Sequence, residues 1–293
     1  MIIDLDKKIN EISNKQYWYF GNHGKDFTQM CYLTDLISQL SSGSTQSDLD
    51  KIRNKFNEEN NLELKASMFK SIISAKMYGL LDVASSRQYV KCNPTEVFYE
   101  IRKRTSGKYE KVELYQDIIE QQIEKIYYIT DLFDTDGKEG FGLYPLFLLY
   151  KVLIEVGNIY GTYEINRFEI EYLLTTAKTY DEWKDIVDTI VYYRTQQIDI
   201  ETTVERLLNR YNTNAPDQRY HLIIKHLNYL DIDGKKSYKI KPEFISVIGD
   251  KVKVFEIINK IPPKSMGALP NGLEDFNDYI SFLGQNIPLL PKL

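Results

Sequence analysis

The chain has 293 residues, of which 43% are hydrophobic and 27% charged, as expected for a soluble globular protein large enough for two domains. Its formal net charge of −5 argues against a protein that coats nucleic acid without sequence preference, because such proteins are basic overall. A sequence-specific binder is still allowed, since its basic side chains need line only one face. No apolar run is long enough to span a membrane and no signal peptide is visible, so we expect a cytoplasmic protein without a membrane partner.

Cysteine usage and charge distribution refine this picture. Cys31 and Cys92 lie far apart in the sequence, which favours free thiols in a reducing cytoplasm. The many Ile, Lys, Asn and Tyr residues are typical of an AT-rich, bacterial genome. Residues 61–104 contain eight Lys or Arg against four Asp or Glu, so one segment of this acidic chain is positive.

Helical periodicity dominates the first half of the chain. Thr45 with Asp48 resembles a capping box, which predicts the start of a helix. Two β-prone runs around a polar turn predict a hairpin, and three helices followed by a hairpin is the order of a winged helix. The predicted elements are helices over Asp26–Leu40, from Thr45 to about Asn57 and over Glu63–Tyr78, and strands over Leu80–Val83 and Tyr89–Cys92.

The second half repeats this order of elements. A longer helix over Val112–Phe133 is expected to link the halves, and the breaker Asp134–Gly140 is expected to end the link. Apolar spacing then predicts five helices before a hairpin around Asp233–Ser237, and a last helix after it. The six helices are Leu143–Val156, Ile165–Thr176, Tyr180–Arg194, Ile200–Tyr211, Asp217–Leu230 and Pro242–Ile258.

These elements predict a mainly α-helical fold with short β-hairpins. We expect two winged-helix-like DNA-binding subdomains joined by a helical linker. The expected boundaries are 1–109 for the first subdomain, 110–140 for the linking helix and loop, 141–260 for the second subdomain and 261–293 for a C-terminal exit segment.

Two helix faces carry side chains suited to DNA contact. The polar face of Glu63–Tyr78 has small residues and one lysine, which can approach a groove closely. The hairpin turn after this helix adds the cation Arg87 and the amide Gln88, which could contact phosphate or the minor groove. The polar face of Asp217–Leu230 has side chains that read bases or bind phosphate, and its hairpin turn adds two cations. The alternative is that both faces are simply solvated. The candidate DNA-binding residues are Ser67, Lys70, Ser71, Ser74, Arg87, Gln88, Gln218, His221, Lys225, Tyr229, Lys235 and Lys236.

The same region also fits the loose PD…(D/E)xK pattern of metal-dependent nucleases, through Asp217, Asp233 and Lys235. That chemistry needs its carboxylates on adjacent strands. Pro216 followed by Asp217 is instead typical of a helix start, and Asp233 followed by Gly234 is typical of a hairpin turn.

Other chemistries are not recognisable in the sequence. His221 and His226 are five residues apart and do not share a helix face, and neither cysteine has a CxxC partner. No phosphate-binding loop, dinucleotide-binding fingerprint or nucleophile elbow is found. We therefore expect no catalytic residue, no metal site and no cofactor in this chain.

The order of motifs resembles the DNA-recognition region of type IIS restriction and nicking endonucleases of the AlwI type. The resemblance covers nearly the whole chain, and the order of its motifs is more specific than any one of them. The stretches that carry it are Lys76–Ile101, Leu143–Arg194 and His226–Ile248, followed by the tail from Leu273 to Leu293.

In that family two winged-helix-like subdomains precede a separate nuclease domain. This chain ends at Leu293, where the nuclease domain would begin, so the resemblance implies a recognition domain or subunit of a restriction endonuclease. Its partners would be double-stranded DNA and a nuclease domain or subunit, and Mg²⁺ is expected only for that nuclease. Two alternatives stay open, namely a complete Mg-dependent restriction nuclease with a degenerate PD-DxK centre and a helical interaction protein that binds no DNA.

Overall fold

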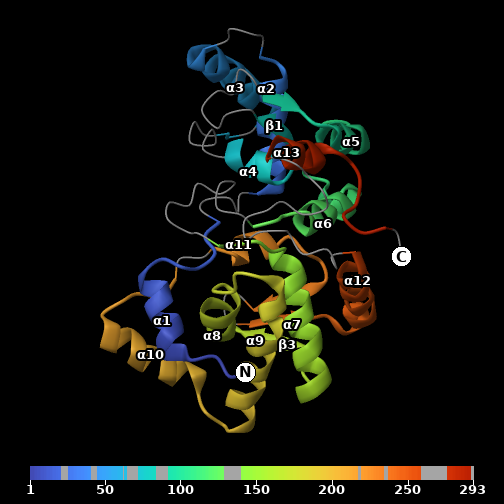
Figure 1. Cartoon of the computed structure of the whole chain (residues 1–293). Helices are drawn as coiled ribbons and strands as arrows, with labels where there is room; N and C mark the ends of the chain where they lie inside the picture. The colour runs from blue at the N-terminus through green and yellow to red at the C-terminus, as the bar shows by residue number, and fades with distance from the viewer. Residues whose placement is uncertain are drawn as a thin grey trace. The chain divides into compact units, whose positions relative to one another are not determined.

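The structure is a computed structural model, and it divides the chain into two compact units (Figure 1). Unit 1 comprises Met1–Gly21, Ile126–Asn271 and Leu290–Leu293, and unit 2 comprises Asn22–Lys125 and Gly272–Leu289. The structure describes residues 1–20, 26–40, 45–61, 63–64, 72–83, 92–128, 140–216, 219–233, 237–258 and 276–291.

Unit 2 begins with the helices that the sequence predicts. The Asp26 carboxylate caps α2 by accepting a hydrogen bond from the Thr28 backbone N–H at 2.9 Å. Thr45 and Asp48 form the predicted capping box at the start of α3. The described elements of unit 2 are α2 (Phe27–Ser38), α3 (Gln46–Asn60), α4 (Ile72–Met77), β1 (Leu81–Val83), β2 (Cys92–Pro94), α5 (Glu96–Thr105), a 3-10 turn (Val112–Leu114), α6 (Gln116–Glu124) and α13 (Phe276–Gly284).

An antiparallel hairpin is confirmed for this unit, but its second strand is Cys92–Pro94 instead of Tyr89–Cys92, of which residues 89–91 lie outside the described ranges. Strands β1 and β2 pair antiparallel, with Leu81 opposite Pro94 and Val83 opposite Cys92. Thr95 then caps α5 through its side chain, so the second strand leads directly into a helix.

The long linking helix predicted over Val112–Phe133 is wrong. The helical part is α6, which ends at Glu124 and buries Ile118, Ile119 and Ile123 within unit 2. Beyond Lys125, Tyr128 forms a β-bridge with Leu143, in which its backbone N–H donates to the Leu143 carbonyl at 2.8 Å. Residues 129–133 of the predicted helix lie outside the described ranges.

The C-terminal helix α13 completes unit 2, although its residues fall in the expected exit segment. The Gln122 side-chain amide donates to the backbone carbonyls of Tyr78 at 3.0 Å and Leu283 at 2.6 Å. The Lys125 ammonium donates to the Gln285 carbonyl at 2.6 Å. Polar side chains of α6 and its end thus satisfy carbonyl groups at the end of α13, which otherwise lack partners.

Unit 1 is built mostly from helices around a small sheet. Its core helix α7 is buried on nearly all faces, starts with Pro145 at the first position and is capped at its C-terminus by Gly161, whose φ of +88° suits glycine. The elements of unit 1 are α1 (Leu5–Ser13), α7 (Pro145–Tyr160), β3 (Glu164–Asn166), α8 (Arg167–Glu169), a π-helical turn (Ile170–Leu174), a 3-10 turn (Tyr180–Glu182), α9 (Trp183–Thr195), α10 (Ile200–Tyr211), α11 (His221–Ile224), β4 (Leu230–Asp233), β5 (Ser237–Ile240), a 3-10 turn (Pro242–Phe244) and α12 (Ile245–Ile258).

Most predicted helices of this unit are confirmed. They are α7, α9, α10 and the segment that includes α12, whose Phe255 ring stacks on Phe147 with 4.1 Å between ring centroids. The predicted helix over Ile165–Thr176 is confirmed except at its start, where Glu164–Asn166 form strand β3. Apolar spacing could not reveal this strand, because three residues are too few to distinguish a strand from the first turn of a helix.

Strand β3 makes the sheet of unit 1 three-stranded. The order is β3-β5-β4, and both pairings are antiparallel. In the cross-strand row at its centre, Lys239 of β5 lies between Glu164 of β3 and Asp231 of β4. The central strand of the sheet is therefore the second strand of the predicted hairpin.

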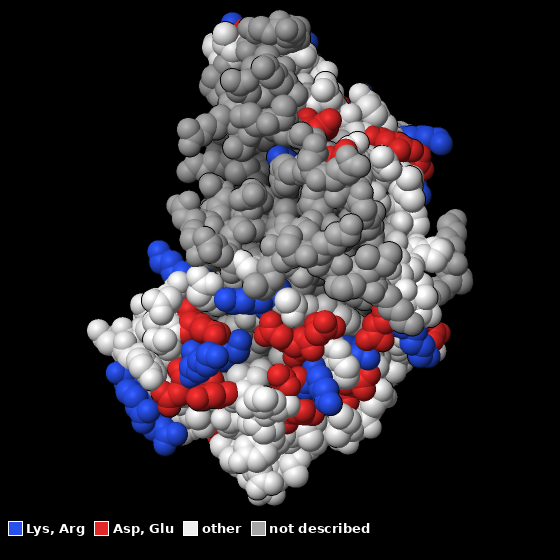
Figure 2. Space-filling view, in the orientation of Figure 1, with Lys and Arg blue, Asp and Glu red and all other residues white. Residues whose placement is uncertain are grey.

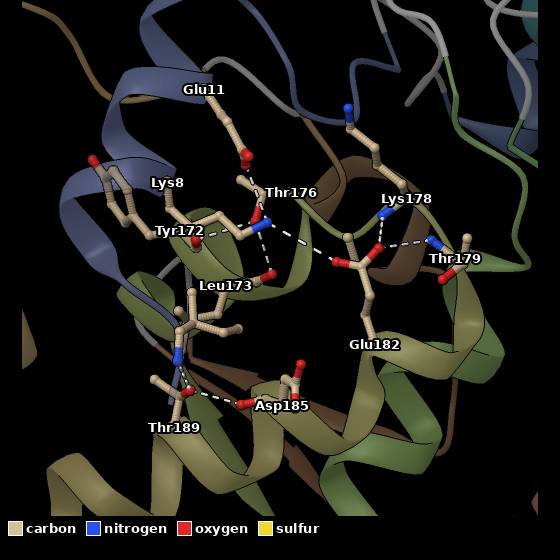
Figure 3. A network of polar contacts seen from close by, with 12 residues as sticks. Lys8, Glu11, Tyr172, Leu173, Thr176, Lys178, Thr179, Glu182, Asp185 and Thr189 are labelled. Atoms are coloured by element: carbon tan, nitrogen blue, oxygen red, sulfur yellow. Dashed lines mark hydrogen bonds and ion pairs between the residues drawn. The ribbon is translucent and has the colours of Figure 1, made fainter. Parts of the chain in front are cut away.

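The first twenty residues pack within unit 1, on the elements that follow α7 (Figure 3). Lys8 of α1 forms an ion pair with Glu11 at 3.1 Å, and its Nζ lies 4.0 Å from a carboxylate oxygen of Glu182. Glu182 also accepts the backbone N–H of Lys178 at 2.7 Å. The buried Trp18 indole donates to the Ala177 carbonyl at 2.8 Å.

A buried ion pair ties three elements of unit 1 together. The Arg194 guanidinium of α9 donates to both carboxylate oxygens of Glu169, at 2.9 and 2.7 Å, and to the Glu164 carbonyl of β3 at 2.8 Å. The side chain of Glu169 is 2% exposed and that of Arg194 is 18% exposed. Two parallel bonds to one carboxylate fix the geometry as well as the charge.

The fold class predicted from sequence is confirmed, because the chain is mainly α-helical with short antiparallel strands. Within the ranges that the structure describes, no helix is long and apolar enough to cross a membrane.

Replacing Arg194 by alanine should destabilise unit 1 by about 3–5 kcal/mol, because it leaves the Glu169 carboxylate buried without its cation. Chemical denaturation measures the loss. The matched control is Arg210→Ala, whose pair with Asp6 is exposed and should contribute less than about 1 kcal/mol. Equal losses in the two variants would contradict this role of Arg194.

Stability should also depend on pH through Lys125. Burial lowers the pKa of its ammonium group from 10.5 to about 7. Between about pH 7 and pH 9 the unfolded chain then binds more protons than the folded chain, so the free energy of unfolding should rise by up to about 1.4 kcal/mol per pH unit. Denaturation profiles of the wild type and Lys125→Met across this range test it, since the variant should have the flatter profile. Parallel profiles would refute it.

Candidate nucleic-acid interface

The segment from Asn214 to Ile240 contains the richest set of candidates, and its local structure differs from the expected one. The helix predicted over Asp217–Leu230 is wrong, because within the described part of that range, residues 219–230, only His221–Ile224 is helical. Arg219 precedes this turn with a φ of +54°, and the chain leaves the helix at Lys225 before entering β4. The predicted apolar residues are nevertheless buried, namely Tyr220, Ile223, Ile224, Leu227 and Leu230.

This geometry separates side chains that a continuous helix would have aligned. His221 and Lys225 remain one turn apart, and Lys225 is exposed while His221 is partly exposed. Tyr229 lies beyond the helix, and its carbonyl accepts the backbone N–H of Lys241 at 3.0 Å. Gln218, Lys235 and Lys236 lie outside the described residues.

Tyr229 has close neighbours that the sequence did not single out. Its ring makes an edge contact with Phe244, with 5.1 Å between ring centroids. The Lys251 ammonium of α12 lies 4.9 Å from the centre of the Tyr229 ring and donates to its hydroxyl at 3.4 Å. Lys251 was missed because it is more than twenty residues further along the chain, and no helical period connects the two positions.

The hairpin β4–β5 is confirmed, and residues 234–236 of the turn expected to act as a wing lie outside the described residues. On one face of the sheet, the alternate positions of the three strands hold the acids Glu164, Asp231 and Asp233, the neutral Asn166 and Ser237, and the cation Lys239. The described residues of this face are therefore acidic in balance, which disfavours contact with phosphate.

The candidate face in unit 2 is described at one position only. Ser67, Lys70, Ser71, Arg87 and Gln88 lie outside the described residues.

Ser74 is described, and its place in unit 2 corrects the prediction. It is 0% exposed, so in this fold it cannot contact DNA. The reason is that α4 packs against both α2 and α13, which covers the side of α4 that the helical wheel assigned to solvent.

Part of the positive charge of residues 61–104 is neutralised by acids of unit 2. Arg104 binds Glu100 at 3.0 Å and Asp117 at 2.7 Å, and Arg102 lies 3.5 Å from Asp35. Lys103 is 80% exposed but lies 3.7 Å from Glu100. The charge excess read from the sequence therefore overstates the charge that is available to a partner.

The described residues offer no metal centre. No group of three or more His, Cys, Asp or Glu side chains there could hold a metal ion. Of the nuclease pattern, Asp233 is exposed at the end of β4, and Asp217 and Lys235 lie outside the described ranges.

On the face of unit 1 shown in Figure 2, acidic and basic side chains are interspersed.

The comparisons with known proteins found a similar fold but no match by sequence. No protein-family model matches the sequence, and neither does any curated protein. The fold is similar to that in the crystal structure of pyrene- and phenanthrene-modified DNA in complex with the BpuJ1 endonuclease binding domain. The two chains are 12% identical with a TM-score of 0.52, and the match covers 92% of this chain and 96% of that one. At this identity the likeness establishes a shared fold.

Proposed function

We propose that this chain is a sequence-specific recognition module for double-stranded DNA in a restriction system. The observation that carries the proposal is the fold, which is similar over nearly the full length of both chains to an endonuclease binding domain seen in complex with DNA. A match that covers 92% of one chain and 96% of the other involves both units rather than one common motif. The order of motifs in the sequence supports the same function independently.

The arrangement of elements in unit 1 supports a winged-helix interpretation. Strand β3 follows the core helix α7 and pairs with β5, and the hairpin β4–β5 comes after the intervening helices. Winged helices typically join an early strand to a late hairpin in this way. The turn of the hairpin and the short helix before it would then be the parts of unit 1 that approach DNA.

The charge distribution in unit 1 favours one side of this hairpin for the contact. Lys225 is exposed at the end of α11. The sheet face that includes Glu164, Asp231 and Asp233 is acidic and would repel phosphate. We therefore infer that DNA lies against α11 and the segment that leads into β4, with Lys225 on the phosphate backbone.

The resemblance to enzymes of the AlwI type extends the proposal to a partner. Since the recognition region of that family precedes a nuclease domain, we infer that a separate nuclease domain or subunit cuts the DNA that this chain binds. Mg²⁺ would belong to that nuclease. In this division of roles the chain supplies the sequence specificity, through contacts to bases and to DNA shape, and phosphate contacts supply much of the affinity.

Selection from a pool of randomised duplexes, with and without Mg²⁺, tests this function. We expect an enriched sequence motif, binding that weakens as salt rises, and no cleavage by this chain alone. Cleavage that Asp217→Ala abolishes would instead support a complete nuclease. The absence of enrichment even at low salt would contradict the proposal and favour an interaction protein that binds no DNA.

Lys225→Ala should weaken binding of the selected duplex and reduce the slope of log K against log salt by about one, because one phosphate contact is lost. The control is Lys184→Ala, since Lys184 is an exposed lysine at the start of α9, far along the chain from α11. Fluorescence anisotropy over a salt series measures both quantities. An unchanged slope in Lys225→Ala would remove this residue from the interface.

A further inference from the structure

We propose that helix α13 is a releasable strap of unit 2, and that its release is coupled to the uptake of a proton by Lys125. This inference goes beyond the proposed function and does not depend on DNA binding. Its basis is the way in which the C-terminal end of α13 packs over a buried lysine that forms no ion pair with any described residue.

The end of α13 fits closely against the turn between α4 and β1. The Gln122 amide donates to the carbonyl oxygens of Tyr78 at 3.0 Å and Leu283 at 2.6 Å, so one side chain joins the end of α4 to the end of α13. Gly79 follows with a φ of +65°, and a Cβ at this position would overlap the Leu283 carbonyl oxygen. The close approach therefore requires glycine in this turn.

Lys125 lies beneath this end of α13. Its residue is 0% exposed, and its Nζ donates to the Gln285 carbonyl at 2.6 Å and lies 5.0 Å from the centre of the Phe282 ring. A carbonyl oxygen and an aromatic ring offset part of the cost of burying an ammonium group, but neither has a full negative charge. Glu96 of α5 is the acid whose charge acts on Lys125, and it does not outweigh burial, which lowers the pKa of Lys125 to about 7.

The packing of α13 allows it to leave while the rest of unit 2 stays folded. Gln122 and Leu283 are 161 residues apart in the sequence, so no short covalent connection ties the helix to the residues that hold it. The described large side chains that α13 buries are Tyr279, Ile280 and Leu283. Elements with few buried apolar contacts open at a lower free-energy cost than the core of a unit.

Release of α13 exposes Lys125 to water, and this couples release to protonation. The pKa of Lys125 is about 7 when α13 is docked and returns towards its ordinary value of 10.5 when the lysine is hydrated. Between these values the released state binds more protons than the docked state. The equilibrium therefore shifts towards release as the pH falls, and the shift levels off below about pH 7.

Release also changes the support of a neighbouring element. It removes the Leu283 carbonyl from Gln122 and uncovers Gly79, so the end of α4 loses the helix that packs on it. The strap thus connects the protonation of a residue at the end of α6 to the packing of the α4–β1 turn.

Native-state hydrogen exchange of the full chain between pH 6.5 and pH 8.5, corrected for chemical exchange rates, tests this coupling. In the wild type, α13 should be less protected than the buried helix α2, and its protection should rise by up to about tenfold per pH unit above pH 7. In Lys125→Met, the protection of α13 should not change with pH. Lys103→Met, at a position of unit 2 that is 80% exposed, is the matched control and should keep the wild-type profile.

The variant also separates Lys125 from the other titratable groups at this site. They are Glu96 of α5, Glu124 of α6 and Tyr279 of α13, whose hydroxyl donates to the Lys125 carbonyl at 2.9 Å. All three are unchanged in Lys125→Met. A pH dependence of α13 protection that persists in this variant would overturn the role of Lys125.

A second variant releases α13 through packing instead of charge. A Cβ at Gly284 would lie 2.9 Å from Cγ2 of Thr95, whose hydroxyl is held by a hydrogen bond from the Phe98 N–H at 3.3 Å. Gly284→Ala should therefore lower the protection of α13 at every pH while α2 stays protected. Ser281→Ala, at an exposed position of the same helix, is its control and should retain wild-type protection.

Two further results would overturn the inference without any variant. Equal protection of α13 and α2 in the wild type would mean that α13 opens only when the whole unit unfolds. Wild-type protection of α13 that does not change between pH 7 and pH 8.5 would mean that release takes up no proton, and this outcome decides the question even if Lys125→Met does not fold.

Discussion

The arrangement of unit 1 depends on the ion pair between Arg194 and Glu169. Arg194 connects α9 to α8 and also binds the Glu164 carbonyl, which fixes the start of β3. Strand β3 pairs with β5, and β5 pairs with β4, so the position of the hairpin follows from this one buried contact and the short strand it holds. A charge pair can take this role because the guanidinium has enough donors to satisfy both a carboxylate and a carbonyl.

The consequence for function is an asymmetric surface around the hairpin. One face of the sheet is acidic in balance, whereas Lys225 is an exposed cation at the end of α11. In a protein with a net charge of −5, such local differences determine where a polyanion can bind. An overall acidic composition is therefore compatible with the DNA-binding role that we propose.

Sequence patterns predicted those parts of the fold that local chemistry determines. The capping box at Thr45, the buried helix α7 and the hairpin β4–β5 all follow from residue types at short spacing. Three features depended on contacts distant in sequence. Strand β3 is three residues long and needs β5 to pair with, Ser74 is covered because α4 packs on α13, and Tyr229 lies beside Lys251 only in the folded chain. The helix predicted after Pro216 was wrong for a related reason, since a single turn followed by a strand buries the same apolar residues.

Hydrogen exchange of the full chain, with and without its selected duplex, tests the central claim most directly. The account predicts that DNA slows exchange in the segment from His221 to Leu230, while the centre of the acidic sheet face is unchanged. It would be contradicted if DNA left this segment unaffected, or if protection appeared on strand β3 and at Asp231 instead.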